Sequence, residues 1–451
     1  MGEKLNRWLE KPVFIYGFGL FFLVFKTAQF FPYFEWKLFL SFLCLYTAIT
    51  FTVLLIAQKL GSGKYMAGWL LIIWIALLFT SNITRVFIQD FKIFFNITYL
   101  LVTVIIVCIF FYLIKKRLNK IFIQRANKLL NIFLFFLMLI NLIAGILNAN
   151  KEKIHAANKS GRSIPIIQHK NDIIWILLDE YGAPESLNDQ FQFHDKLVDS
   201  LRNKSFYVFD SLASRTDATI YSLNSLFNLD DSIPITNYQY AAYYLKKSKW
   251  VEELEKQGYS FIDLDFLNIG GKEKFININI FPDNYTEKIF NNTFFAILLN
   301  KLKGIDDKMR IDDYNGKVIQ ALTKTVQQKV SYPRFIWSHL MIPHLPFYRN
   351  ENGSLNPKPL YDPVLYSKAE LSKQYLDYVS YANSVVLKIL NEIPDRQQKT
   401  IIITGDHGAR MLVSKNDKQR FETFAAIYYP RMDTTELINI RYLQQIPLHL
   451  H

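Results

Sequence analysis

The sequence predicts a bundle of five transmembrane helices followed by an external α/β domain with a mostly parallel sheet. Three observations indicate this fold. The first 150 residues contain five long apolar segments, whereas the rest alternates short apolar runs with amphipathic helical patterns. Charge is just as uneven, because residues 1–150 hold 15 Lys and Arg against 4 Asp and Glu, and the remainder holds 37 against 35.

The five apolar segments are each near the length of about 20 residues that crosses a bilayer. They cover roughly residues 12–31, 38–58, 65–84, 94–114 and 129–148, which makes residues 1–148 the predicted membrane domain. Lys26 interrupts the first segment, and we expect it to snorkel or to face other helices. A cleaved signal peptide is the alternative for this segment, but no small-residue cleavage site follows it and four more spans do.

Basic residues between the spans predict the orientation of the chain. They gather at the N-terminus, in the turn between the second and third segments, and between the fourth and fifth: Lys4, Arg7, Lys11; Lys59, Lys64; Lys115, Lys116, Arg117, Lys120, Arg125. The positive-inside rule places these regions in the cytoplasm. Everything after the fifth span is then extracytoplasmic (periplasmic), and the chain is a multi-pass protein of the inner or plasma membrane. The positive charge is explained by the membrane and does not indicate a nucleic-acid partner.

A polar stretch at residues 149–171, with Gly161 and Pro165, is the predicted juxtamembrane linker to a domain at 172–451. Apolar runs of strand length occur at 173–178, 207–209, 261–264, 335–337, 401–404 and 424–429, and a clear amphipathic helix covers 370–393. Strands that alternate with such helices favour a mostly parallel sheet covered on both faces. Both cysteines, Cys44 and Cys108, lie in the membrane half, so no disulfide or cysteine zinc site is expected in the second domain.

Two predicted strands end in acidic residues. The strand at 401–404 runs into Gly405, and Asp406 and His407 follow directly. Carboxylate and imidazole are metal ligands, and the carboxyl edge of an open sheet is where such folds bind ligands. The alternative is an Asp turn with an exposed histidine. The strand at 173–178 ends in Asp179 and Glu180, which would otherwise cap the following helix.

Two further stretches carry reactive side chains. Hydroxyl residues cluster between Arg215 and Asn228, where an irregular segment becomes a helix. A helix start is a ready anion site, although a hydroxyl there can also be an ordinary N-cap. His339 and His344 follow the strand at 335–337 in a loop fixed by two prolines. A structural role is the usual one for a single histidine, and two in one stiff loop make a functional role more plausible.

Together these stretches resemble the sulfatase-like branch of the alkaline phosphatase superfamily over about residues 170–430. The similarity is greatest to lipoteichoic acid synthases and lipid A phosphoethanolamine transferases, which also carry a five-span anchor. In this family a strand-end acid, a nucleophilic threonine and a late Asp-His pair hold one divalent metal. The pair corresponds to Asp406 and His407. The threonine motif corresponds to the stretch Thr-Asp-Ala-Thr-Ile-Tyr-Ser, which makes Thr219 the catalytic nucleophile and metal ligand, with Thr216 as the alternative.

The resemblance leaves the first acid open. Members with Asp-Gly align Asp179, which we prefer, whereas members with Gly-Glu align Glu180, which is kept as a possible second ligand. The His-x-Pro-Phe loop makes His344 a catalytic and substrate-side histidine, and His339 and Arg215 are further expected substrate contacts. The oxygen and nitrogen ligands suit zinc or manganese, and a second metal is left open.

The chemistry follows from these residue types. A metal lowers the pKa of a coordinated hydroxyl, so the Thr219 alkoxide can attack a phosphodiester and form a phosphothreonine. The helix N-terminus would offset charge on the equatorial oxygens, and His344 would stabilise or protonate the leaving oxygen. A second alcohol, or water, then releases the phospho-group.

The predicted protein is a monomeric phosphotransferase. It would move phosphoethanolamine or glycerol phosphate from a phospholipid to an extracytoplasmic glycan or lipid. The alternatives are a phosphodiesterase, a sulfatase-like hydrolase and a non-catalytic relative. A sulfatase would need a C/S-x-P-x-R sequence, which is absent around Thr219, and the retained acid, threonine and histidine elements argue against a non-catalytic role. Family members usually continue through further helices after the last strand, whereas 21 residues follow Pro430 here, so a domain shortened at its C-terminus, or a short branch, is expected.

Overall fold

The computed structural model describes most of the chain, in two compact units. The described residues are 2–28, 36–59, 63–80, 82–83, 105–106, 109, 119–157, 165–229 except 169, 238–272, 275, 293–295, 307–430 except 361, 362 and 364, and 434–450. Unit 1 comprises residues 1–158 and 279–305, and unit 2 comprises residues 159–278 and 306–451. Each unit is described by itself.

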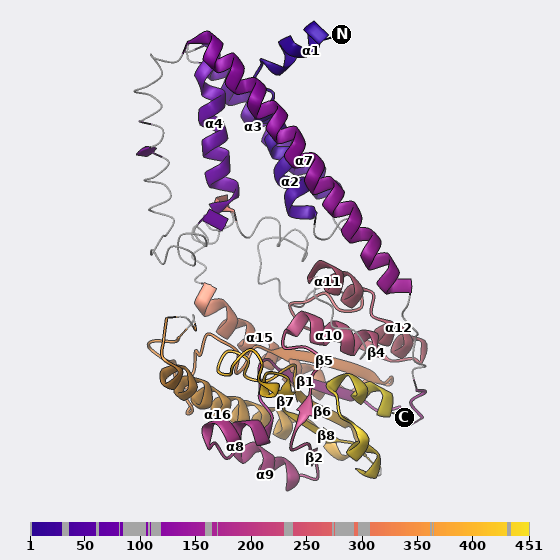
Figure 1. The fold of residues 1–451 in the computed structure, drawn as a ribbon. Helices are drawn as coiled ribbons and strands as arrows, with labels where there is room; N and C mark the ends of the chain where they lie inside the picture. Colours follow the sequence, from indigo (N-terminus) through magenta and orange to yellow (C-terminus); the bar gives the residue numbers. More distant parts are fainter. Residues whose placement is uncertain are drawn as a thin grey trace. The chain divides into compact units, whose positions relative to one another are not determined.

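Unit 1 is helical. Its main helices are α1 (Gly2–Leu9), α2 (Phe14–Thr27), α3 (Trp36–Lys59), α4 (Gly63–Leu78) and α7 (Lys120–Ala157) (Figure 1). Two stretches, Phe39–Lys59 and Lys120–Leu147, are long and apolar enough to cross a membrane, and Phe14–Thr27 and Ala67–Leu78 are shorter apolar helices. The predicted span at 94–114 lies almost wholly outside the described residues. Five spans therefore stay a prediction.

The helices of unit 1 pack around α2, which contacts α3, α4 and α7. Tyr46 on α3 donates its hydroxyl to the Ile15 carbonyl at 2.6 Å, and a Cβ at Gly19 would lie 2.4 Å from the Tyr46 ring. Only glycine therefore lets the two helices approach so closely. The sequence allowed Lys26 either to snorkel or to face other helices. Its ammonium lies over the ring of Phe79, the residue that follows α4, so it faces the end of that helix.

Helix α7 continues beyond the predicted fifth span. It ends at Ala157, so the first residues of the predicted linker 149–171 extend the helix. The stretch from residue 170 leads directly into the first strand of unit 2.

Unit 2 is an α/β domain built on a six-stranded sheet of order β2-β8-β6-β1-β5-β4. Strands β6, β1, β5 and β4 are parallel, whereas β8 and β2 are antiparallel to their neighbours, so the predicted mostly parallel sheet is confirmed. The strands of this sheet are β1 (Ile173–Leu178), β2 (Tyr207–Val208), β4 (Ser260–Leu264), β5 (Arg334–Leu340), β6 (Thr400–Gly405) and β8 (Ala425–Tyr428). A separate two-stranded sheet is formed by β3 (Leu212–Ala213) and β7 (Glu422–Thr423).

Helices cover both faces of this sheet (Figure 1). They are α8 (Pro184–Phe191), α9 (Lys196–Arg202), α10 (Thr219–Asn228), α11 (Tyr238–Lys246), α12 (Lys249–Lys256), α15 (Asp307–Gln327) and α16 (Lys368–Glu392). The last of these is the helix predicted at 370–393. Its start is fixed by a capping box in which Ser367 and Glu370 satisfy each other's backbone N–H groups.

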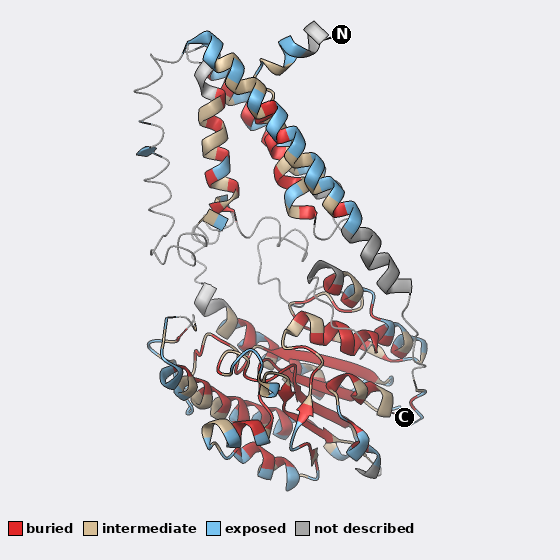
Figure 2. Ribbon diagram, viewed as in Figure 1, coloured by how far each residue is buried: buried red, intermediate tan, exposed pale blue. Residues whose placement is uncertain are grey.

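Alternation along β1 explains why both faces are covered. All six of its residues are buried (Figure 2). Ile174, Ile176 and Leu178 belong to the aliphatic core formed with α8, α9, α15 and α16. Trp175 points to the opposite face, where its ring packs against Trp337 of β5 and Trp250 of α12. A strand buried on both sides reads as an unbroken apolar run, which is what the sequence shows.

The turn after β6 is unusually tight. A Cβ at Gly405 would lie 2.3 Å from the Thr423 hydroxyl, and one at Gly408 would lie 2.0 Å from the Gln419 carbonyl oxygen. Neither position can hold a side chain without displacing backbone. The two glycines thus let the chain fold back on β7, with Asp406 and His407 held between them.

The C-terminal residues pack onto α10. They form two 3₁₀ helices, η4 (Thr434–Asn439) and η5 (Leu443–His449), and Leu443 and Ile446 are fully buried. Gln444 donates to the Ser222 hydroxyl at 3.3 Å in the first turns of α10. This segment therefore supports the start of α10, while shortening of the domain relative to its family stays a prediction.

Candidate metal centre

The ends of β1 and β6, neighbours in the sheet, bring three predicted ligands together. Side-chain ligand atoms of Asp179, Asp406 and His407 all lie within 4.8 Å of one another, and all three residues are buried. Asp406 and His407 are completely inaccessible, and Asp179 is 2% exposed. Among the described residues, this is the one group of three or more acidic, histidine or cysteine residues with such spacing.

Each of these three residues keeps one buried polar atom without a hydrogen-bond partner. The atoms are Asp179 Oδ1, Asp406 Oδ2 and His407 Nε2. The remaining atoms are engaged: Asp406 Oδ1 accepts from the N–H groups of Glu180 and His407, both at 2.9 Å, and His407 Nδ1 donates to the Gly408 carbonyl at 2.9 Å. That bond leaves the lone pair of His407 on Nε2.

Buried polar atoms without a hydrogen bond are costly, and two of these, Asp406 Oδ2 and His407 Nε2, lie 3.3 Å apart. An arrangement with one such atom on each of three neighbouring side chains fits a bound cation. Although burial opposes ionisation, the imidazoles of His344, His339 and His407 hold the pKa of Asp179 below its usual value. An ionised carboxylate is the form that binds metal. The oxygen and nitrogen donors fit zinc or manganese, as expected.

Glu180 lies beside this group but outside it. Its φ is +65°, and its Oε1 accepts from the Met411 N–H at 3.4 Å. Oε2 lies 3.8 Å from His344 Nε2. Burial raises the pKa of Glu180, against the opposing charges of His344, His407 and Arg410. The geometry favours Asp179 as the first acid, and ligation by Glu180 stays a prediction.

Thr219 is the first residue of α10, and the preceding Ala218 provides no side-chain cap. The N–H groups of the first turn are therefore not occupied by a capping side chain. Thr219 is partly exposed, and no described residue hydrogen-bonds its hydroxyl. Thr216 is buried instead, with its hydroxyl donating to the Ala218 carbonyl at 3.2 Å. The helix start is tied to the metal group because Ser222 donates to the Asp406 carbonyl at 2.8 Å.

The two predicted histidines have different surroundings. The His344 side chain is 19% exposed, and the carboxylates of Asp179 and Glu180 raise its pKa although burial alone would lower it. His339 is fully buried between two carboxylates, with Nδ1 3.0 Å from Asp265 Oδ2 and Nε2 3.3 Å from Asp179 Oδ2. Burial would lower the pKa of His339, but Asp265 and Asp179 raise it to about 10. Both ring nitrogens of His339 contact carboxylates, which favours a role in orienting Asp179 over direct contact with a substrate.

Arg215 lies against the C-terminal segment. Its guanidinium carbon is 3.3 Å from the centroid of the Tyr442 ring, and its backbone N–H donates to Gln444 at 3.3 Å. The expected roles of Arg215 and His339 as substrate contacts stay predictions.

Two residues near the centre are absent from the sequence-based site. Asp265 directly follows β4 and also accepts from Trp337 Nε1 at 2.9 Å. An acid directly after an apolar strand is the signal that identified Asp179, and it was present here as well. Arg410 places Nε 4.0 Å from Glu180 Oε1 and donates to the Asp217 carbonyl at 2.5 Å. Its position three residues after His407 is the signal that could have found it.

Asp265→Asn is expected to weaken metal affinity about 10- to 100-fold, which is the usual effect of losing a residue that orients a metal ligand. The reason is that Asp265 orients His339, which in turn donates to Asp179. Competition against a chelator with Zn²⁺ measures the change. Asp263→Asn is the matched control two residues earlier, within β4, where Asp263 Oδ2 accepts from the Ile269 N–H at 3.4 Å and the carboxylate makes no hydrogen bond with His339. Equal losses in both variants would show a general effect on β4 instead.

The fold and this centre together indicate an α/β enzyme with a group of candidate metal ligands at the carboxyl edge of a parallel sheet. The family model described as sulfatase matches residues 171–427, more than half of the chain. The chain therefore belongs to the sulfatase family, and the predicted membership of the sulfatase-like branch is confirmed. No curated protein matches the sequence.

Several solved structures are similar to the chain. The integral membrane protein lipooligosaccharide phosphoethanolamine transferase A from Neisseria meningitidis is 12% identical, with 96% of this chain and 91% of that chain covered and a TM-score of 0.43. The zinc complex of the C-terminal periplasmic domain of EptC from Escherichia coli is 11% identical, with coverage of 60% and 76% and a TM-score of 0.37. A protein in the alkaline phosphatase superfamily from Vibrio parahaemolyticus is 14% identical, with coverage of 60% and 64% and a TM-score of 0.38.

Proposed function

We propose that the protein is a membrane-anchored phosphotransferase. It moves a phospho-substituent, of the phosphoethanolamine or glycerol phosphate type, from a phospholipid to an extracytoplasmic glycan or lipid. The observation that carries this proposal is the open hydroxyl of Thr219 at an uncapped helix start, tied through Ser222 to the buried Asp179, Asp406 and His407 group. The two helices long and apolar enough to cross a membrane support a lipid donor.

Asp179, Asp406 and His407 would hold a divalent ion, zinc or manganese, with Thr219 or Glu180 as a further ligand. Bound there, the ion would lower the pKa of a coordinated hydroxyl and offset negative charge on the phosphoryl oxygens. The first N–H groups of α10 add to this, because they and the helix dipole favour an anion at Thr219.

The first half-reaction is a displacement at phosphorus. Thr219 reacts as the alkoxide, its proton having been released to solvent: Oγ1 forms a bond to the phosphorus of the phospholipid, and the bond from phosphorus to the diacylglycerol oxygen breaks. His344 donates the proton that the leaving oxygen takes up, and the carboxylates of Asp179 and Glu180, which raise its pKa against the effect of burial, favour the protonated imidazole that this step needs. The products are diacylglycerol and a phosphothreonine that still carries the headgroup, as a phosphodiester on Thr219 Oγ1.

The second half-reaction restores the enzyme. A hydroxyl of the acceptor attacks the same phosphorus, passes its proton to the now neutral His344, and the bond to Thr219 Oγ1 breaks. Arg410, which lies beside Glu180, would contact the phospho-group in both half-reactions. Water in place of the acceptor gives a phosphodiesterase, which is the competing function.

Transfer and hydrolysis are separated by following both halves of the donor. The full chain is reconstituted in vesicles with either phosphatidylethanolamine or phosphatidylglycerol, each labelled in its headgroup, together with extracted envelope glycolipid. We expect diacylglycerol release to match label that appears on the acceptor. Label that appears only as free phosphoethanolamine or glycerol phosphate would assign a hydrolase. Absence of diacylglycerol release with every donor, with zinc and with manganese, would contradict both.

A further inference from the structure

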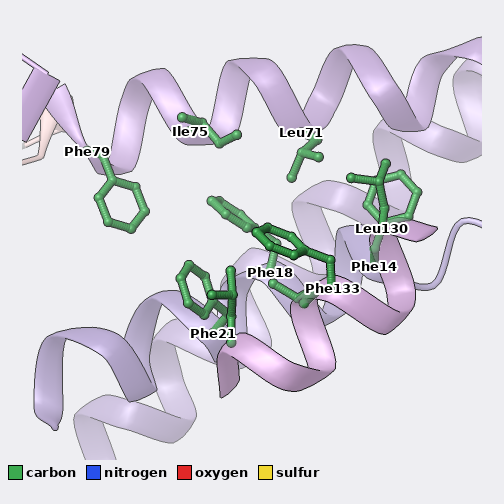
Figure 3. Close-up of a pocket in the computed structure, with 10 residues that line it drawn as sticks. Phe14, Phe18, Phe21, Leu71, Ile75, Phe79, Leu130 and Phe133 are labelled. Carbon is green, nitrogen blue, oxygen red and sulfur yellow. The ribbon is translucent and has the colours of Figure 1, made fainter. Parts of the chain in front are cut away.

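Unit 1 contains a cavity of about 340 Å³ between α2, α4 and α7 (Figure 3). All ten of its lining residues are apolar, and five of them are phenylalanines: Phe14, Phe18, Phe21, Leu71, Ile75, Phe79, Leu130, Phe133, Leu134 and Leu137. Its size is within the range of ligand sites, about 300–1,000 Å³. The wall offers no hydrogen bond, so the part of an occupant that enters must be apolar.

The cavity is elongated along α2. Phe14, Phe18 and Phe21 line it over about 10 Å of helix, at 1.5 Å per residue. An occupant that fills the cavity gains dispersion contacts with the atoms of this wall. An extended hydrocarbon chain matches both the apolar wall and the elongated shape.

A cation stands at one end of the cavity. Lys26 lies five residues beyond Phe21 on α2, and its ammonium is 5.5 Å from the centroid of the Phe79 ring, which itself lines the cavity. The ammonium donates to Asn82 Oδ1 at 3.0 Å. No carboxylate of the described residues pairs with it. A lysine amid apolar side chains without a counter-charge is costly and usually has a functional partner.

We propose that this cavity binds one acyl chain of a phospholipid, with the lipid phosphate at Lys26 and the amide of the exposed Asn82. The cation and the apolar wall together match an amphipathic anion, whereas a free sugar would not match the apolar wall and a neutral lipid would leave the cation without a partner charge. The proposal depends on unit 1 lying in a membrane and not on the transfer chemistry of unit 2. In the predicted orientation α2 runs outward, so the phosphate belongs to the extracytoplasmic leaflet.

Native mass spectrometry of the full chain in detergent, titrated with phosphatidylglycerol or diacylglycerol, tests this site. We expect one phosphatidylglycerol to bind in preference to further copies, and diacylglycerol, which lacks the phosphate, to bind at least about tenfold more weakly. Lys26→Gln should remove most of that preference. Leu137→Trp, which fills the cavity, should abolish the first binding step, whereas Phe136→Trp, on the exposed face of the same helix, should not.

The outcomes distinguish the possible occupants. Equal affinity for both lipids would show that the cavity takes an apolar chain without the phosphate contact, which overturns the proposal. Absence of a preferred first lipid in the wild type would overturn it too, as expected if another part of the chain covers the cavity. Lys26→Gln leaves the cavity wall unchanged, so it decides the matter even if Leu137→Trp fails to fold. Headgroup transfer by unit 2 is scored separately and has no bearing on this result.

Discussion

Thr219→Ala is expected to lower turnover by at least about 10⁴-fold, as removal of an enzyme nucleophile commonly does. Folding should remain, because the Thr219 hydroxyl makes no hydrogen bond with any described residue and alanine is a good helix former. Metal content should remain largely intact, because the buried group of Asp179, Asp406 and His407 is unchanged. Diacylglycerol release gives the rate, and circular dichroism and elemental analysis report the fold and the metal.

The neighbouring hydroxyls provide the controls. Thr216→Ala should only weaken turnover, since its hydroxyl bonds the Ala218 carbonyl within the loop. Brief incubation of the wild type with a phospholipid donor, followed by mass spectrometry, maps the trapped phospho-group. A phospho-group on Thr216 or Ser222 would reassign the nucleophile. Undiminished turnover by Thr219→Ala would rule out the covalent mechanism.

His407→Ala and Asp406→Ala are each expected to abolish metal retention. One of about four ligands is lost in each, and the site is left open to exchanging water. Elemental analysis of the purified full chain measures the metal-to-protein ratio, which should fall from near one to near zero. Turnover should fall with it.

Two further variants separate ligand loss from local unfolding. Asp406→Asn retains an oxygen that can accept from the N–H groups of Glu180 and His407, yet loses the charge, so it should lose metal without loss of structure. His194→Ala changes an exposed histidine that pairs only with Asp199, so it should retain metal fully. A metal content that is unchanged in His407→Ala and Asp406→Ala would place the site elsewhere.

The strands that the sequence predicts best are those buried on both faces. β1 is predicted at its observed bounds, because six apolar residues run without interruption between two acids. β5 is predicted only as 335–337, although it covers Arg334–Leu340. Three of its four extra residues are polar and buried, and they are stabilised by distant partners: Arg334 pairs with Asp172 at 2.5 Å, and Ser338 donates to the Trp175 carbonyl at 3.1 Å. Periodicity in one segment does not reveal such partners.

The sequence predicts residue types at the centre better than their partners. Asp179, Asp406 and His407 are found because each directly follows a strand that is itself evident. The contact between His339 and Asp265 is not predicted, because the two residues are 74 positions apart and no local pattern links them. The same limit applies to the antiparallel strands β2 and β8, since apolar runs do not encode the direction of pairing.

The sheet order also has a consequence for synthesis. β1 lies between β5 and β6, so its two neighbours are made long after it, with 160 residues from Asp179 to His339 and 226 from Glu180 to Asp406. At about 5–20 residues per second, β1 lacks β6 for about 10–45 s after it leaves the ribosome. Throughout that interval six consecutive apolar residues have an unpaired edge, which is a template for aggregation. β1, which ends at the candidate ligand Asp179, is thus expected to need a chaperone during synthesis, and the candidate metal site is complete only after nine-tenths of the chain has been translated.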